Sequence, residues 1–428
     1  MLKKAKSLFS IVLMLFGYQL SAQNLSKSPY SALGIGDMQF GGSAFMSGMG
    51  QIGQGISLPN SLNNQNPASY SALQLTTWDA AATGSMANIS TATASGSFNT
   101  ASMAYMALGV PLSQKLNWGL SFGLMPYSGV GYNVTRQVQA ATFNGTERVE
   151  GRGGLSKFYL GSGIKVFKNL HAGFNVSYLY GQTSNTTLLS IPRDSLMYNL
   201  VENRDRYMGD LALEIGLQYT DTFIYKQKKY SFGVGATFGP QTSLSATDNY
   251  NVRTLGVGIT APTNLGKDTV ANVAERSGKV IIPMYLKGGV FFQQVNKWGI
   301  GVDVAYNNWS NYLGMGIRDS LKNMTSLNFG GFYTPDAFAI KSYFKRVEYR
   351  AGVRYDNGML SANGTNVSTL AFSIGAGLPL GKTRSKVNLA AEYMMRGTTD
   401  QKLVREEYIR FVIGVSISDK WFYRYRYD

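Results

Sequence analysis

The chain has 428 residues and a net charge of +16, with 49 glycines, 13% aromatic residues and only 15% charged residues. Cysteine is absent, so the sequence excludes disulfides and a lipid-modified cysteine. Lysine and arginine are scattered along the chain rather than gathered on one helix, which argues against nucleic-acid binding. No linker or low-complexity tract divides the chain, so the composition favours one large sheet domain.

Residues 1–22 have the pattern of a secretory signal peptide. Three lysines precede an apolar run from Leu8 to Phe16, and small residues follow at Ser21 and Ala22. The run is about half as long as the ~20 residues that a membrane-spanning helix needs. We therefore predict cleavage after Ala22, with an uncleaved anchor helix as the weaker alternative, and exclude these residues from the fold.

Apolar and polar residues alternate with period two in many segments of the remaining chain. Within 207–219, leucine, isoleucine and tyrosine occupy every second position from Leu211 to Tyr219, and Asp210 and Glu214 fall on the other face. The segment 347–355 repeats the pattern with tyrosine, alanine and valine on one face. Strands that face lipid on one side and a polar lumen on the other require this alternation.

The alternation predicts fourteen strands, an even number that is typical of single-chain bacterial outer-membrane barrels. The predicted strands span 74–87, 97–110, 116–130, 154–167, 170–182, 207–220, 229–244, 281–294, 297–309, 322–334, 346–356, 368–379, 386–397 and 406–417. The predicted fold is therefore all-β, a transmembrane antiparallel β-barrel over 74–418 with a periplasmic tail at 419–428.

The connections between the predicted strands alternate in length, which gives the barrel an orientation. Polar connections of about twenty residues or more at 131–153, 183–206 and 249–280 are predicted to be extracellular loops. One connection, 334–345, falls on the periplasmic side yet is fairly long. The short connections, predicted to be periplasmic turns, lie at Gln114, Lys168, Lys226, Asn296 and Lys382.

Residues 23–73 precede the first strand and do not alternate. They are rich in glycine, serine and asparagine. A lumen surrounded by fourteen strands is wide enough to hold such a segment and would otherwise be an open aqueous hole. We therefore predict that 23–73 fold inward as an N-terminal plug, or hatch.

Three stretches of the chain resemble the long-chain fatty-acid transporter (FadL-type) family of outer-membrane proteins. They are Met49-Gly50-x-x-Gly53 with Asn66-Pro67-Ala68, then Pro283, Gly288, Trp298-Gly299, Asp303 and Asn308-Trp309-Ser310, and finally Tyr349-Arg350-Ala351-Gly352. The resemblance implies a fourteen-stranded barrel with an N-terminal hatch. It also implies uptake of hydrophobic molecules, typically fatty acids or aromatic hydrocarbons, with sideways release into the membrane.

The third predicted strand contains residues that interrupt a β-ladder. Pro126 has no N–H to donate, and Gly129 and Gly131 follow it closely. We predict a local break there, and the resemblance implies that the break opens a lateral gap in the wall. The alternative is that Pro126 only ends the strand near the outer rim.

Candidate ligand contacts fall in the hatch and on a late strand. An inward arginine can hold a ligand carboxylate with its bidentate fork. A network of cross-strand ion pairs and hydrogen bonds that stiffens the barrel also explains such residues. Apolar hatch residues contact a ligand or simply seat the plug. The candidates are Phe40, Phe45, Met49, Asn66, Pro67, Arg350 and Arg354.

Motifs that imitate enzyme sites lack the context that those sites need. Gly48-x-Gly50-x-x-Gly53 follows no strand and opens no helix, so it is a poor dinucleotide site. Gly119-x-Ser121-x-Gly123 lies along a strand rather than at a strand-to-helix turn, and His171 is the single histidine. We predict no catalytic activity, no cofactor and no metal.

Two functions fit the predicted barrel in the outer membrane. The leading one is passive transport of hydrophobic small molecules or lipids, with outer-membrane lipid as surroundings and no nucleic-acid partner. The alternative is a transporter-like barrel that serves as a structural or shuttle component of a cell-surface secretion or assembly complex. It fits because long outer loops are where outer-membrane protein partners dock.

Overall fold

The structure is a computed structural model of the chain. The predicted signal peptide and the part of the predicted tail beyond residue 421 lie outside the residues that it describes. The described residues are 26–39, 42–140, 143–191, 197–256, 266–362, 364–381 and 383–421.

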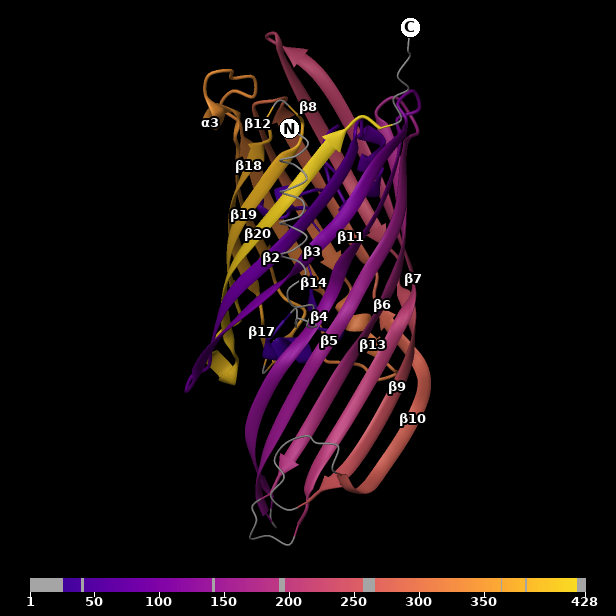
Figure 1. The fold of residues 1–428 in the computed structure, drawn as a ribbon, viewed down its shortest axis with the longest axis vertical. Helices are drawn as coiled ribbons and strands as arrows, with labels where there is room; N and C mark the ends of the chain where they lie inside the picture. Colours follow the sequence, from indigo (N-terminus) through magenta and orange to yellow (C-terminus); the bar gives the residue numbers. More distant parts are fainter. Residues whose placement is uncertain are drawn as a thin grey trace, which may run out of the picture.

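Antiparallel strands that follow one another in chain order build the wall of a barrel (Figure 1). Their bounds are β2 (Thr76–Ser90), β3 (Ser95–Ser113), β4 (Trp118–Ala140), β5 (Phe143–Lys165), β6 (Leu170–Ser190), β7 (Asn199–Tyr225), β8 (Lys228–Gly239), β9 (Thr242–Leu255), β10 (Gly266–Ile282), β11 (Tyr285–Gln294), β12 (Trp298–Asn307), β14 (Met324–Tyr333), β15 (Glu348–Asp356), β18 (Thr369–Pro379), β19 (Lys386–Arg396) and β20 (Arg405–Asp419). β20 pairs with β2 and closes the barrel.

Two prolines interrupt strands that otherwise run on. β8 continues into β9 past Pro240, and β10 continues into β11 past Pro283, where the ladder lacks a main-chain donor. With each pair taken as one strand, the wall has fourteen strands. The all-β class and the strand number predicted from the alternation are confirmed.

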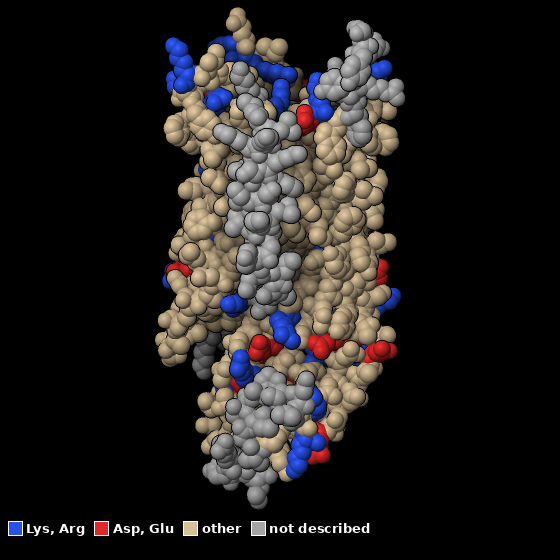
Figure 2. All heavy atoms as spheres, viewed as in Figure 1, with Lys and Arg blue, Asp and Glu red and all other residues tan. Residues whose placement is uncertain are grey.

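The outer surface of the wall carries an apolar band. Leu211, Leu213 and Ile215 of β7 point outward and are exposed, whereas the intervening Glu214 is buried inside. Figure 2 shows charged residues gathered toward the two ends of the molecule, with a wide band between them that holds few. This band is what a wall in contact with lipid requires. Among the described residues, no helix is long and apolar enough to cross a membrane.

The two ends of the barrel differ in how the strands are joined. At one end, which we call the short-turn end, tight turns join β3 to β4, β5 to β6, β7 to β8 and β11 to β12. At the opposite hairpin end, the pairs β4–β5, β6–β7 and β9–β10 reach beyond the rest of the wall (Figure 1). The short-turn end corresponds to the predicted periplasmic side.

The predicted loops at 131–153, 183–206 and 249–280 are wrong. Most of their residues extend the strands as regular antiparallel hairpins. Main-chain hydrogen bonds hold a hairpin without apolar alternation where neither face needs to contact lipid. These strand extensions were missed because their polar sequences lack the apolar alternation from which the strands were predicted.

The N-terminal segment, defined here as the described residues between 26 and 73, contains only short elements. They are η1 (Pro29–Ala32), β1 (Asp37–Met38), α2 (Ala44–Ser47) and η2 (Pro67–Ala72). Its residues from 42 onward pack on wall glycines, where an added Cβ atom would press on the backbone or side chains of the segment. These glycines, which surround the segment on most sides, are Gly119 of β4, Gly163 of β5, Gly173 of β6, Gly216 of β7, Gly233 and Gly235 of β8, Gly330 of β14, Gly352 of β15 and Gly375 of β18.

Polar side chains of the wall also hold the backbone of this segment. The Asp303 carboxylate accepts hydrogen bonds from the backbone N–H groups of Gly53, at 2.6 Å, and Gln54, at 2.9 Å. The Ser373 hydroxyl accepts one from the N–H of Gly50 at 2.8 Å. Each bond satisfies a donor that burial would otherwise leave unpaired.

Candidate functional site

The wall is interrupted between β3 and β4. Their hydrogen-bonded register ends at Met106 and Leu124, and beyond it β3 pairs with β2 while β4 pairs with β5. Pro126 lies two residues beyond Leu124, and the β4–β5 register shifts between Pro126 and Ser128. A residue without an N–H next to a bulge bends a strand away from its neighbour. We call this place the wall opening.

The first part of the N-terminal segment lies along the wall opening. β1 pairs with Ser128 and Gly129 of β4, on the edge that β3 leaves free. The N–H of Gly131 donates to the Ser31 hydroxyl at 3.0 Å. All three predicted gap residues therefore lie at the opening, and Gly129 and Gly131 contact the N-terminal segment there. Their role as a lateral gap stays a prediction.

A cavity of about 150 Å³ lies behind the wall opening. It combines apolar residues with hydroxyl and charged groups. Its lining includes Thr83 and Ser85 of β2, Phe98, Thr100 and Ser102 of β3, Asp37, Met38 and Gln39 of the N-terminal segment, and Met394, Arg396, Tyr408 and Arg410 of β19 and β20.

An ion-pair cluster at the cavity holds the N-terminal segment to the wall. The Arg396 guanidinium lies 2.8 Å from the Asp37 carboxylate, 3.6 Å from that of Glu406, and 5.0 Å from the centre of the Tyr30 ring. Glu406 is fully buried and also accepts a hydrogen bond from the Ser28 hydroxyl. One cation from β19 thus serves two carboxylates, one from the segment and one from β20.

Tyr30 adds a second attachment beside this cluster. Its hydroxyl donates to the carbonyl oxygen of Val404 at 2.7 Å and accepts from the Val404 N–H at 3.0 Å. Burial raises the pKa of the Tyr30 hydroxyl above its ordinary value, so the group keeps the proton that it donates. Sequence reasoning missed Tyr30, Asp37 and Glu406, because no periodic pattern links residues so distant in the chain.

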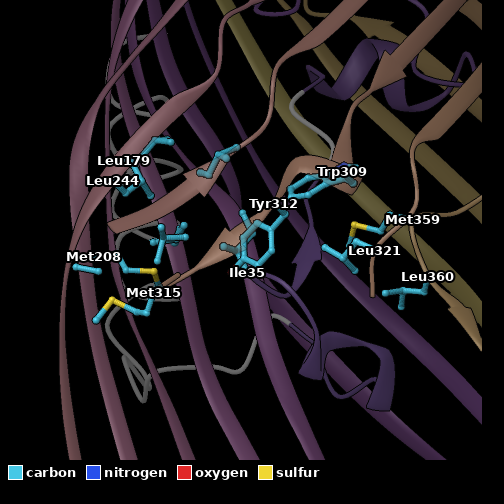
Figure 3. Close-up of a cluster of buried hydrophobic side chains, with 14 of the residues drawn as sticks. Ile35, Leu179, Met208, Leu244, Trp309, Tyr312, Met315, Leu321, Met359 and Leu360 are labelled. Atoms are coloured by element: carbon cyan, nitrogen blue, oxygen red, sulfur yellow. The ribbon is translucent and has the colours of Figure 1, made fainter. Parts of the chain in front are cut away.

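Side chains of this chain fill the barrel near the hairpin end (Figure 3). The connection from β12 to β14 turns inward and buries Trp309 and Tyr312 against Ile35 of the N-terminal segment. The connection from β15 to β18 adds Met359 and Leu360 to the same cluster. The wall contributes Leu155, Leu179, Met208, Leu244, Val280 and Ile282. We call this group the mouth cluster.

None of the predicted ligand contacts that the structure describes lines the cavity. Phe45 and Met49 are buried in one apolar cluster that the N-terminal segment forms with Phe291 of β11. Asn66 donates to the Leu217 carbonyl at 3.2 Å and begins η2, whose first residue is Pro67. Phe40 lies outside the described residues. The other six do not line the cavity.

The two predicted wall arginines are both engaged in ion pairs. Arg350 lies 2.8 Å from Glu348 and 5.7 Å from the ring centre of Phe45. Arg354 lies 2.9 Å from Glu392. The pair of Arg354 joins β15 to β19, whereas Arg350 and Glu348 both lie on β15.

The residues that imitate a hydrolase site do not meet. The Ser121 hydroxyl bonds to that of Tyr159 at 3.1 Å, whereas His171 Nδ1 lies 2.7 Å from the Ser71 hydroxyl. Within the described part of the chain, no group of three or more histidine, cysteine, aspartate and glutamate side chains is placed to hold a metal ion.

A family model described as BamG matches residues 1–428 of this sequence. The chain belongs to the BamG family. No curated protein matches it. The FadL-type resemblance seen in the sequence therefore does not give the family of this BamG member.

Solved structures show where the FadL-type resemblance holds. CymD, a monoaromatic hydrocarbon channel, has a TM-score of 0.55 at 14% identity, covering 89% of this chain and 98% of its own. The toluene transporter TbuX of Ralstonia pickettii has a TM-score of 0.55 at 14% identity, covering 88% and 98%. A FadL homologue of Pseudomonas aeruginosa has 0.56 at 13%, covering 90% and 99%. This BamG protein thus has the fold of FadL-type barrels.

Proposed function

We propose that this BamG protein lets small hydrophobic molecules pass by diffusion through the outer membrane, by way of the wall opening. The observation that carries the proposal is the cavity, which lies at the place where β3 and β4 part and the N-terminal segment covers the edge. In the proposal, residues 42–73 are the plug and residues 26–39 are the gate. The fold shared with hydrocarbon channels supports it.

The cavity favours a molecule of one ring over a long fatty acid. A cavity of 150 Å³ is comparable with engineered protein cavities that hold benzene. The apolar Phe98, Met38 and Met394 suit a ring, and the hydroxyls of Thr100 and Ser102 suit one polar substituent. In this proposal the predicted contacts in the plug and at Arg350 and Arg354 maintain the plug instead of binding the ligand.

Filling the cavity should block passage. Thr100→Trp places an indole in the cavity, and we expect uptake of a labelled monoaromatic compound into proteoliposomes to fall at least about tenfold, a loss equivalent to about 1.4 kcal/mol. Ala101→Trp is the matched control, because the neighbouring side chain on β3 points to the opposite face. Equal uptake by the Thr100→Trp variant and the control would contradict the proposal.

A second candidate is a structural role in a cell-surface complex, and the mouth cluster favours it. A passage to the hairpin end would have to pass buried Trp309, Tyr312 and Leu321, which fill that part of the lumen with the chain's own side chains. For this role we expect wild-type uptake equal to that of protein-free liposomes, together with stable co-purification of outer-membrane proteins. Uptake above that baseline would contradict it.

A further inference from the structure

The connection between β14 and β15 stands out at the short-turn end because it is long and carries exposed apolar side chains. Residues 334–347 join the two strands and contain the single turn of helix α3 (Tyr343–Arg346). Ile340 is 97% exposed, Phe338 77% and Phe344 74%. Large apolar groups that face water this fully mark a surface that something else covers.

Cations alternate with these apolar residues. Lys341, Lys345 and Arg346 lie in the connection, where Asp336 is the single carboxylate. Among the described ion pairs, the neighbouring Glu348 is taken by Arg350 and Lys386, so it does not neutralise the connection. Figure 2 shows lysine and arginine gathered around this end of the barrel, whereas acidic and basic residues mix toward the hairpin end.

Contacts place this connection beside the outer face of the wall. Tyr349 is on the outward face of β15, and its hydroxyl donates to the Phe344 carbonyl at 3.2 Å. The Tyr343 hydroxyl donates to the carbonyl of Pro379, at the end of neighbouring β18, at 3.2 Å. Tyr333 pairs with Tyr349 across the two strands, and both are exposed. Exposed tyrosines at a strand end are typical of the membrane interface.

We propose that residues 335–346 are an interfacial anchor for anionic phospholipid. Phe338, Ile340 and Phe344 enter the acyl region of the adjacent leaflet, and Lys341, Lys345 and Arg346 bind its phosphate headgroups. The charge and the position beside the outward tyrosines favour lipid over a protein partner, because basic groups next to apolar ones match an anionic interface. The inference rests on the barrel spanning a membrane and not on transport.

The absence of cysteine from the chain allows a direct test with single nitroxide labels in nanodiscs. Ile340→Cys reports on the anchor. Phe329→Cys, outward in the middle of β14, is the lipid reference, and Ile317→Cys, exposed near the hairpin end, is the water reference. For each label we compare the accessibility to oxygen, which is enriched in lipid, with the accessibility to a water-soluble nickel reagent. We expect the ratio of the two at position 340 to match the ratio at the lipid reference. A match to the water reference would overturn the anchor.

The headgroup contact has its own measurement, the phosphatidylglycerol retained by the purified barrel in native mass spectrometry. We expect each of Lys341→Gln, Lys345→Gln and Arg346→Gln to weaken retention about fivefold, the effect of one cation at an anionic surface. The matched control replaces Arg152, Lys267 and Arg276, exposed cations of the hairpin end, with glutamine. Equal retention by this control and by the triple variant Lys341→Gln, Lys345→Gln, Arg346→Gln would overturn the headgroup contact. If the label at position 340 is protected from the nickel reagent only when outer-membrane proteins are added, the anchor binds protein and not lipid.

Discussion

Arg396→Met is expected to release the gate, residues 26–39, from the wall. Methionine keeps most of the side-chain volume but leaves Asp37 and the fully buried Glu406 without their cation. Removing one partner of a buried ion pair destabilises a protein by about 3–5 kcal/mol. We expect this loss in the attachment of the gate, since the strands of the wall keep their main-chain pairing.

A cysteine in place of buried Ser31 measures the attachment through its reaction with a maleimide. A loss of about 3–5 kcal/mol in the attachment of the gate corresponds to maleimide labelling that is more than about a hundredfold faster than in the barrel that keeps Arg396. Arg405→Met is the matched control, because Arg405 pairs with Glu407 on the exposed face of the adjacent strand, where a pair contributes about 1 kcal/mol or less. If both variants label Ser31→Cys at the wild-type rate, the ion-pair cluster does not hold the gate. In proteoliposomes, Arg396→Met should raise uptake if the gate limits passage.

Gly352→Val is expected to expel the plug, residues 42–73. A Cβ atom at Gly352 would overlap the backbone of Met49 and Gly50, which cannot turn away as a flexible side chain can. Inserting methyl groups into a packed core costs about 1–3 kcal/mol and more where the neighbours are rigid. We expect protease cleavage within the plug while the barrel still migrates as a folded species in unheated gels.

Gly96→Val is the control for this substitution. Gly96 is also on a wall strand, but a Cβ atom there meets nothing within 4 Å. We expect its plug to resist protease like that of the wild type. A protease-resistant plug in the Gly352→Val barrel would show that close backbone approach to the wall does not hold the plug.

These two variants separate the two parts of the N-terminal segment. In the proposal, loss of the plug empties the part of the lumen that residues 42–73 fill and leaves the mouth cluster in place. Loss of the gate uncovers the wall opening with the plug in place. Comparing the uptake of the two barrels therefore distinguishes passage through the lumen from passage through the wall. The structural alternative is tested by the wild-type barrel instead, because that alternative requires wild-type uptake equal to that of protein-free liposomes.

The sequence alone determined the wall of the barrel. Alternation predicted each of the fourteen strands, and for some the ends agree closely, such as 368–379 against Thr369–Pro379 for β18. Pro126 predicted where β4 separates from β3, because a proline has no N–H to donate to a neighbouring strand, whatever surrounds it. Both features depend on short stretches of sequence. Contact with lipid on one face imposes a period of two on each strand, and a proline interrupts the hydrogen-bonded ladder at its own position.

Only the tertiary structure decided what lies inside the barrel and what extends beyond it. The polar hairpins contain no apolar signal, since pairing rather than burial holds them. The pair between Arg396 and Asp37 joins residues 359 positions apart, and the mouth cluster gathers two connections that sequence reasoning left as loops. Closure of the sheet brings such residues together. The alternation in each strand predicts whether a side chain points inward or outward, but it does not predict which residue of another strand or of the N-terminal segment the side chain contacts. The ion pair of Arg354 shows the same limit, because the inward direction of Arg354 was predictable and its pairing with Glu392 of β19 was not.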